Sequence, residues 1–286
     1  MVGKKNVGGK IVKLLVLLLF AFVFIVPLWL ILTSSFEESM SFTKNGYSLV
    51  VRDMSVAAYK RLFGETLFWR SFLNSFWVTA VTVVLSVTIN TVTAYVLHEK
   101  ELPFHGLLNF LFVFTMFFNA GMIPTYLIIK SLNMLDSFVS MILPPALGVY
   151  NVLLVRNYLY SLPKAMEEAA LVDGANHFQI LFTVVVPVSK PIIITTALIT
   201  LISKWNSWMD VLLYTRSKEE LWTVQYYIRT LINAVNSENV STEGNNLQGE
   251  QVLSAAIVVT ILPVVLLFPT LQKYFANGIT LGSVKG

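Results

Sequence analysis

Residues 162–191, LPKAMEEAALVDGANHFQILFTVVVPVSKP, form a polar stretch between two long hydrophobic segments. Residues 164–172 are rich in strong helix formers, and Pro163 suits the first turn of a helix with Ser161 as its N-cap. Gly174 can adopt the left-handed conformation that ends a helix. The stretch is therefore expected to begin with a short helix that stops at this glycine.

A second helix is predicted after the glycine. Residues 176–186 carry a helical pattern, Asp173 can cap it, and the pattern is expected to stop before Pro187. A helix–glycine–helix element between hydrophobic segments indicates a compact knob on the cytoplasmic side of a membrane protein. The alternative is an ordinary loop that folds back on its own chain.

The composition of the whole chain is that of a membrane protein. Of its 286 residues, 56% are hydrophobic and only 13% are charged, and the mean hydropathy is +0.70. This balance lies far from that of soluble domains. Cysteine is absent, which excludes disulfides and thiol chemistry. The net charge is only +4, without a basic stretch interleaved with aromatic residues, so nucleic-acid binding is not indicated.

Six hydrophobic segments are long enough to cross a bilayer. We therefore predict an all-α membrane protein with six transmembrane helices, at residues 14–36, 71–97, 106–129, 138–155, 188–211 and 252–272. The third is expected to be softly broken at Gly121 and Pro124. Membrane helices tolerate proline, as the fourth and sixth must do at Pro144, Pro145, Pro263 and Pro269.

The predicted topology follows from the first helix. Residues 1–13 hold four lysines, which favour a cytoplasmic N-terminal segment before a transmembrane domain at 14–286. Six spans then place both termini and the stretch 162–191 in the cytoplasm. The loops 37–70 and 212–251 lie outside, the first with a short amphipathic helix around residues 56–63 and the second long and polar. A signal peptide does not fit, because the first apolar run is too long and no cleavage site follows.

The order Glu168-Ala169-Ala170, Gly174, then Val184-x-Val186-Pro187 resembles the EAA loop of ABC-importer permeases. That loop reads E-A-A, three residues, G, nine residues, I-x-L-P, so the chain keeps every interval and departs only in its two valines. The segments FWRSFLNS (68–75), WNSW (205–208) and GITLGSVKG (278–286) are similar to segments of carbohydrate permeases. The resemblance extends from about residue 11 to the last residue and is closest to MalG-like subunits of the LplC/YtcP type, associated with complex oligosaccharides.

This resemblance implies a MetI-like permease subunit of an ATP-driven oligosaccharide importer in the bacterial cytoplasmic membrane, working by alternating access. The implied partners are a second related permease, two ATP-binding subunits that hold the ATP and magnesium, and an extracytoplasmic sugar-binding protein. Coupling to the ATPase would run through the EAA-like loop, at Glu167, Glu168, Ala169, Ala170, Asp173, Gly174 and Pro187. Three alternatives stay open: an ABC importer for a non-sugar solute, an ion-coupled secondary transporter, and a structural membrane anchor.

Catalytic chemistry is not indicated. The three histidines are scattered without metal-ligand spacing. Glu167 and Glu168 are adjacent, and on a helix they point about 100° apart, so they do not form an acid–base pair. We expect this subunit to catalyse nothing by itself and to hold no cofactor.

The fifth hydrophobic segment turns polar early. Its uncharged part, 191–203, is too short to cross roughly 30 Å at about 1.5 Å per residue. Aromatic rings stack on sugar faces, and amides and carboxylates bind hydroxyls. The predicted sugar path is therefore Lys204, Trp205, Asn206, Trp208 and Asp210, with the two tryptophans on one helical face. The competing interpretation is an interfacial belt of tryptophans with a snorkelling lysine.

Overall fold

The computed structural model describes residues 7–118, 120–238 and 249–280. The described residues are helical, apart from turns and one isolated bridge between Glu37 and Met54. The all-α prediction is confirmed. Three predicted features lie partly outside the described residues. They are the N-terminal lysine cluster, the polar part of the predicted second outer loop, and the C-terminal segment GITLGSVKG. The chain divides into two compact units, residues 1–68 with 228–262 and residues 69–227 with 263–286.

The helices agree with up to six membrane crossings. Four are long and apolar enough to cross a bilayer by themselves: Gly9–Ser35, Thr66–His98, Phe138–Leu159 and Gly249–Leu267. Two further pairs of helices pass the same test only when joined, because they are bent by 111° and 82°. Each bent pair, counted as one span, brings the number in the described part of the chain to six.

The first unit carries the segment predicted as the first outer loop. Helix α1 (Val7–Ser35) meets α15 (Gly249–Thr280) through Ser34, whose hydroxyl donates to Ser254 at 2.8 Å. Helix α3 (Ala57–Gly64) is the predicted amphipathic helix, within one residue at each end. Helix α2 (Ser39–Asn45) was not predicted, because only seven residues form it and most of them are polar.

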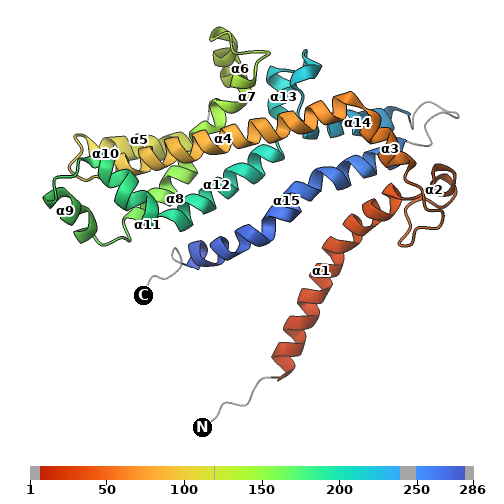
Figure 1. The fold of residues 1–286 in the computed structure, drawn as a ribbon, viewed down its shortest axis with the longest axis horizontal. Helices are drawn as coiled ribbons and strands as arrows, with labels where there is room; N and C mark the ends of the chain where they lie inside the picture. Colours follow the sequence, from red (N-terminus) through yellow and green to blue (C-terminus); the bar gives the residue numbers. More distant parts are fainter. Residues whose placement is uncertain (1–6, 119, 239–248, 281–286) are drawn as a thin grey trace. The chain divides into compact units, whose positions relative to one another are not determined.

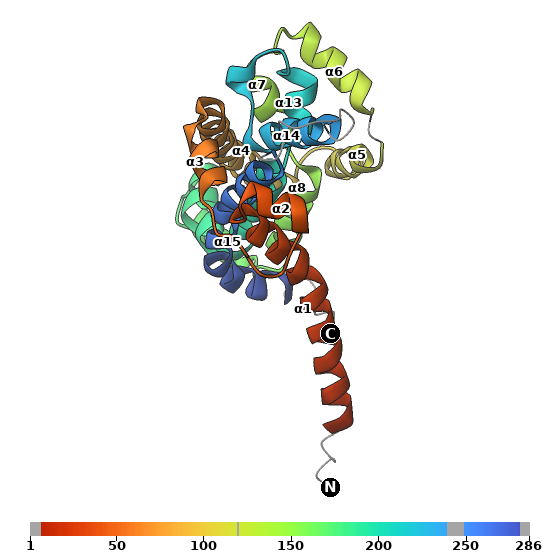
Figure 2. The same cartoon turned by 90° about the vertical axis from the view of Figure 1, so that its right-hand side faces the viewer.

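The second unit contains a bundle of long helices, in which α4, α5, α8 and α12 run side by side (Figure 1). Their bounds are Thr66–His98 for α4, of which residues 69–98 belong to this unit, His105–Phe117 for α5, Val149–Leu159 for α8 and Lys190–Trp205 for α12. Short helices α9 (Ala165–Val172), α10 (His177–Ile180) and α11 (Val186–Val188) lie at one end. Helices α7 (Phe138–Ile142) and α13 (Met209–Tyr214) pack side by side toward the other end (Figures 1 and 2).

A stripe of small polar residues on α4 allows this helix to pack closely against its neighbours in the bundle. One face of α4 buries six of them at intervals of three or four residues, which places them in one line: Ser71, Ser75, Thr79, Thr82, Ser86 and Asn90. Small side chains let membrane helices approach closely. Hydrogen bonds then join α4 to its neighbours: Asn90 Oδ1 accepts from Gly148 N at 3.0 Å, and Ser86 Oγ lies 3.3 Å from Thr200 Oγ1.

The third span breaks more sharply than predicted. Helix α5 ends at Phe117 and α6 (Met122–Ser131) leaves at 111° to it. Gly121 precedes α6 with φ +89°, a conformation that cannot continue a right-handed helix. Pro124 lies in the first turn of α6, where its missing N–H leaves no bond unmade. The position of the break was therefore predicted correctly, but not its size.

The fourth span, the fifth span and the predicted second outer loop also differ from prediction. In the fifth span, α12 ends at Trp205 rather than near residue 211. In the fourth span, Pro144–Ala146 form a 3₁₀ turn, labelled η1, between α7 and α8, and α8 continues to Leu159 rather than ending near residue 155. The segment predicted as the second outer loop contains a 15-residue helix, α14 (Val224–Glu238). Val224, Tyr227 and Ile228 are buried at helical spacing. The polar residues between them concealed this amphipathic pattern.

Candidate functional site

The predicted knob, residues 162–191, begins as expected and continues differently. Helix α9 ends before Gly174, whose φ of +84° is the predicted left-handed conformation. The residue that caps α10 is Asn176 and not Asp173. The Oδ1 atom of Asn176 accepts from Gln179 N at 2.9 Å, and Gln179 Oε1 accepts from Asn176 N at 2.9 Å. This reciprocal box needs a residue in extended conformation three positions before a glutamine, which only Asn176 provides. Ser161 donates to Tyr158 O and caps nothing.

The helix after the glycine does not stop before Pro187. It continues through a π turn, Leu181–Val185, labelled η2, and through α11 to Val188, before the chain bends by 82° into α12. A proline ring clashes with the carbonyl four residues earlier in a regular α-helix. A π turn widens the helix directly before the proline, which is how this segment accommodates Pro187 without a break.

Helix α9 has an inner and an outer face. Ala170 packs against the apolar cluster that contains Val155, Leu159 and Ile180. Glu168, Ala169 and Asp173 are exposed. The knob therefore has a fixed apolar base and presents an acidic, small-residue surface.

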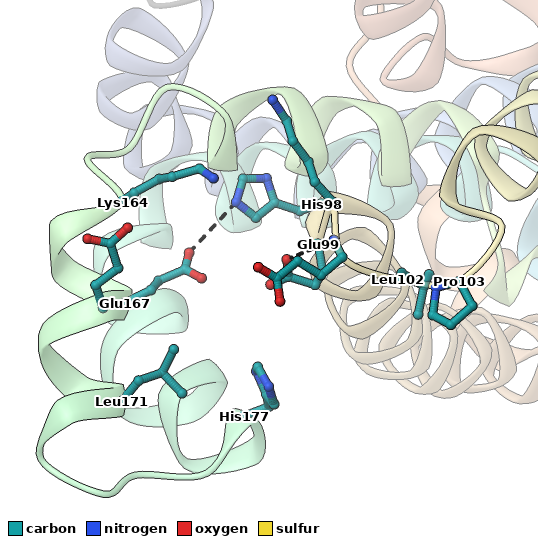
Figure 3. Close-up of a pocket in the computed structure, with 11 residues that line it drawn as sticks. His98, Glu99, Leu102, Pro103, Lys164, Glu167, Leu171 and His177 are labelled. Carbon is teal, nitrogen blue, oxygen red and sulfur yellow. Dashed lines mark hydrogen bonds and ion pairs between the residues drawn. The ribbon is translucent and has the colours of Figure 1, made fainter.

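Glu167 closes one side of a polar recess beside this surface (Figure 3). Its carboxylate lies 3.8 Å from His98 Nε2, across the gap between α9 and the end of α4. Burial raises the pKa of Glu167, and the charge of Glu99 raises it further, while Lys164 and His177 act in the opposite direction. The recess has a volume of about 450 Å³. The ionisable residues that line it are His98, Glu99, Lys100, Glu101, Lys164, Glu167, Glu168 and His177.

The predicted sugar-path residues lie at the other end of the second unit, where they do not share one helix. Helix α12 ends at Trp205 and α13 begins at Met209, so no common helical face holds Trp205 and Trp208. Trp205 is 4% exposed, with its ring edge-on to Phe72 at a centroid distance of 5.9 Å. Trp208 packs against a second apolar cluster, whose members include Val78 and Val211, and Asn206 is exposed.

An ion pair joins the helices that meet at this end of α12. Lys204 Nζ lies 2.6 Å from Asp210 Oδ2 and donates to Met141 O at 2.5 Å. Ser207 Oγ donates to the same carboxylate oxygen at 2.7 Å. The lysine thus connects α12, α13 and α7, because the chain turns back at 206–208 and brings Asp210 to it.

The ion pair lines a cavity of about 430 Å³ among α4, η1, α8, α12 and α13. Asn151 and Thr82, 8% and 0% exposed, line it as well. Asn151 Oδ1 and Thr82 Oγ1 are buried without a hydrogen-bond partner in the protein, although buried polar atoms are nearly always bonded. The sequence interpretation missed Thr82, Tyr150, Asn151, Thr200, Ser203 and Ser207. The polar stripe of α4 was the signal that could have revealed Thr82.

Metal binding finds no support in the described part of the chain, where no three His, Asp or Glu side chains are placed to hold an ion. What remains is an all-helical membrane domain with a polar cavity among its spanning helices and a knob at one end of the bundle. Together these features are those expected of a membrane transport subunit.

The chain belongs to the family of binding-protein-dependent transport system inner membrane components, whose family model matches residues 5–281. It is a permease subunit of the ABC-importer type and a multi-pass protein of the cytoplasmic membrane. This confirms the family resemblance and the MetI-like fold. The family also removes the ion-coupled secondary transporter and the structural anchor from the alternatives.

Individual relatives agree over nearly their whole length. The chain is 34% identical over 274 residues to the polygalacturonan/rhamnogalacturonan transport system permease protein YtcP of Bacillus subtilis (strain 168), which covers 94% of this chain and 96% of YtcP. It is 33% identical over 265 residues to protein LplC of the same organism, covering 92% and 90%. Among solved structures, a bacterial ABC transporter involved in the import of the acidic polysaccharide alginate matches with a TM-score of 0.85 and 31% identity, covering 96% of this chain and 99% of that one.

Proposed function

We propose that this subunit carries oligosaccharides into the cell in an ATP-driven importer. Its relatives are named for polysaccharide transport, and the cavity beside the Lys204–Asp210 pair supports the same cargo. Its volume of about 430 Å³ falls within the usual range of ligand sites, roughly 300–1,000 Å³. An importer for a non-sugar solute is the second candidate, favoured only by the ion pair.

The observation that carries this proposal is the polar lining of the cavity. Besides the Lys204–Asp210 pair, hydroxyl and amide side chains line it, and these groups form hydrogen bonds with the hydroxyl groups that a sugar offers in number: Thr82, Tyr150, Asn151, Thr200, Ser203 and Ser207. Of the residues predicted from the sequence, Lys204 and Asp210 line this cavity directly. Trp205, Asn206 and Trp208 stay predictions as contacts along the path.

Coupling is proposed to run through the knob. The exposed face of α9 at Glu168, Ala169 and Asp173 docks on an ATP-binding subunit, with the alanine permitting close approach. ATP and magnesium bind on that partner, and closure of the two ATP-binding subunits moves the knob and opens the spans alternately to either side. The assembly comprises this chain, a second related permease, two ATP-binding subunits and an extracytoplasmic sugar-binding protein, with both termini of this chain in the cytoplasm.

The test is ATPase stimulation and uptake by the reconstituted importer, with a panel of oligosaccharides delivered by its binding protein. Tyr150→Phe removes one exposed hydroxyl group from the cavity, and a hydrogen bond worth about 1 kcal/mol corresponds to about a fivefold weaker apparent affinity. Tyr47→Phe, which removes an equally exposed hydroxyl group from the first unit, is the matched control. Stimulation by amino acids or metal ions, and by no sugar, would contradict the proposal.

A further inference from the structure

The ion pair in the cavity is unequally buried. The Lys204 side chain is 5% exposed, whereas that of Asp210 is 30% exposed. An ammonium group carries three N–H donors. The bonds to Met141 O and Asp210 Oδ2 use two of them, which leaves one donor on a side chain that lines the cavity.

Such a lysine needs a negative partner, because an uncompensated buried charge is strongly destabilising. Asp210 meets that need, but its side chain is 30% exposed, so a change of rotamer can take its carboxylate away from the lysine. A carboxylate that enters the cavity can take its place at Lys204 Nζ, so the ammonium stays paired throughout. A neutral sugar offers no such replacement and has to bind beside the intact pair.

We propose that the cavity selects acidic sugars, with the carboxylate of a uronate unit on Lys204 and Asp210 as the exchangeable counter-ion. Lys204 and Asp210 are the only charged groups among the described residues that line the cavity. Tyr150 and Ser203, which line the same cavity and are exposed, form hydrogen bonds with the hydroxyl groups of the same unit. The inference rests on the proposed function and narrows its substrate class from oligosaccharides to oligouronates.

The experiment compares two probes that differ only in charge. Oligogalacturonates of two to six units and their methyl esters are delivered to the complete importer in liposomes, and the ratio of acid uptake to ester uptake is measured. The binding protein is the same in every preparation, so its own preference cancels when variants are compared with the wild type. Amounts are normalised to membrane-inserted permease.

Lys204→Gln is expected to lower the acid-to-ester ratio at least tenfold, while ester uptake changes little. Asp210→Asn is expected to raise the ratio, because it removes the competing carboxylate. Since either variant alone disturbs the ion pair, Lys204→Gln combined with Asp210→Asn keeps the cavity neutral and is expected to give the low ratio of the lysine variant. Lys190→Gln removes an exposed positive charge from the same helix and is expected to leave the ratio unchanged.

Two failures are distinguishable. Normal uptake with the wild-type ratio in both Lys204→Gln and the double variant overturns the acidic-sugar inference and leaves the proposed function standing. If the wild-type importer takes up neither probe and no other oligosaccharide, the proposed function fails, and the inference fails with it.

Discussion

The partly buried carboxyl group of Glu167 makes the stability of the folded protein depend on pH. Its carboxyl group is partly buried between α9 and the end of α4, where desolvation and Glu99 raise its pKa. The folded protein therefore binds this proton more tightly than the unfolded chain does. Stability contributed here is present at low pH and is lost as pH rises from the ordinary value of 4.5 toward the raised one.

Glu167→Gln should accordingly flatten the pH dependence of stability. As pH rises above about 4, the melting temperature of the solubilised permease is expected to fall relative to that of the variant. The imidazole of His98, 3.8 Å away, opposes this trend only while it is protonated. Glu168→Gln removes the exposed neighbouring carboxylate and serves as the control. Parallel curves for the wild type and Glu167→Gln would show that burial does not govern this carboxyl group.

The sugar path shows what single residues reveal from sequence. Lys204 and Asp210 could be singled out from the sequence, because ionisable groups at membrane depth are costly and need a partner. That they pair with each other could not be predicted, since six positions apart they meet only when the helix ends between them. Asn151 carried no local signal, because one amide in an apolar segment is ordinary until the cavity beside it is known.

At the scale of elements, length and hydrophobicity predicted the long helices, but local chemistry decided their ends. The glycine at 174 and the break at 121 followed from backbone preference. The continuation through Pro187 did not, because it depends on a π turn that no local propensity indicates. Helix α14 was missed for a different reason. Its buried stripe is narrow and its average composition is polar, so it resembles a loop in sequence.

The turn between α9 and α10 gives a prediction for the coupling knob. Gly174 has φ +84°, and a Cβ atom added there would meet no other atom within 4 Å. Gly174→Val therefore acts through backbone strain alone, roughly 1–3 kcal/mol, which the turn relieves by displacing α9. We expect sugar-stimulated ATPase activity and uptake to fall severalfold, measured on the assembled importer, with normal membrane insertion.

Gly174→Asn is the matched variant, because asparagine tolerates the left-handed conformation. It should retain most of the activity that the valine variant loses. Equal losses in both variants would mean that the side chain itself, rather than the backbone of this turn, disturbs the contact with the ATP-binding subunit.

At the scale of the whole molecule, the family and the fold establish a multi-pass membrane protein, and its orientation is testable on a clean background because the chain has no cysteine. The lysines of residues 1–13 favour a cytoplasmic N-terminus, and six crossings then put residues 162–191 inside and residues 37–70 outside.

Val172 and Val50 are suitable reporters, at 87% and 70% exposed in the two segments. In intact cells, an impermeant thiol reagent should label Val50→Cys and spare Val172→Cys. After detergent opens the membrane and dissociates the importer, both should react, which controls for reactivity. Labelling of Val172→Cys in intact cells would put the knob on the wrong side for an ATPase and remove the basis of the coupling proposal.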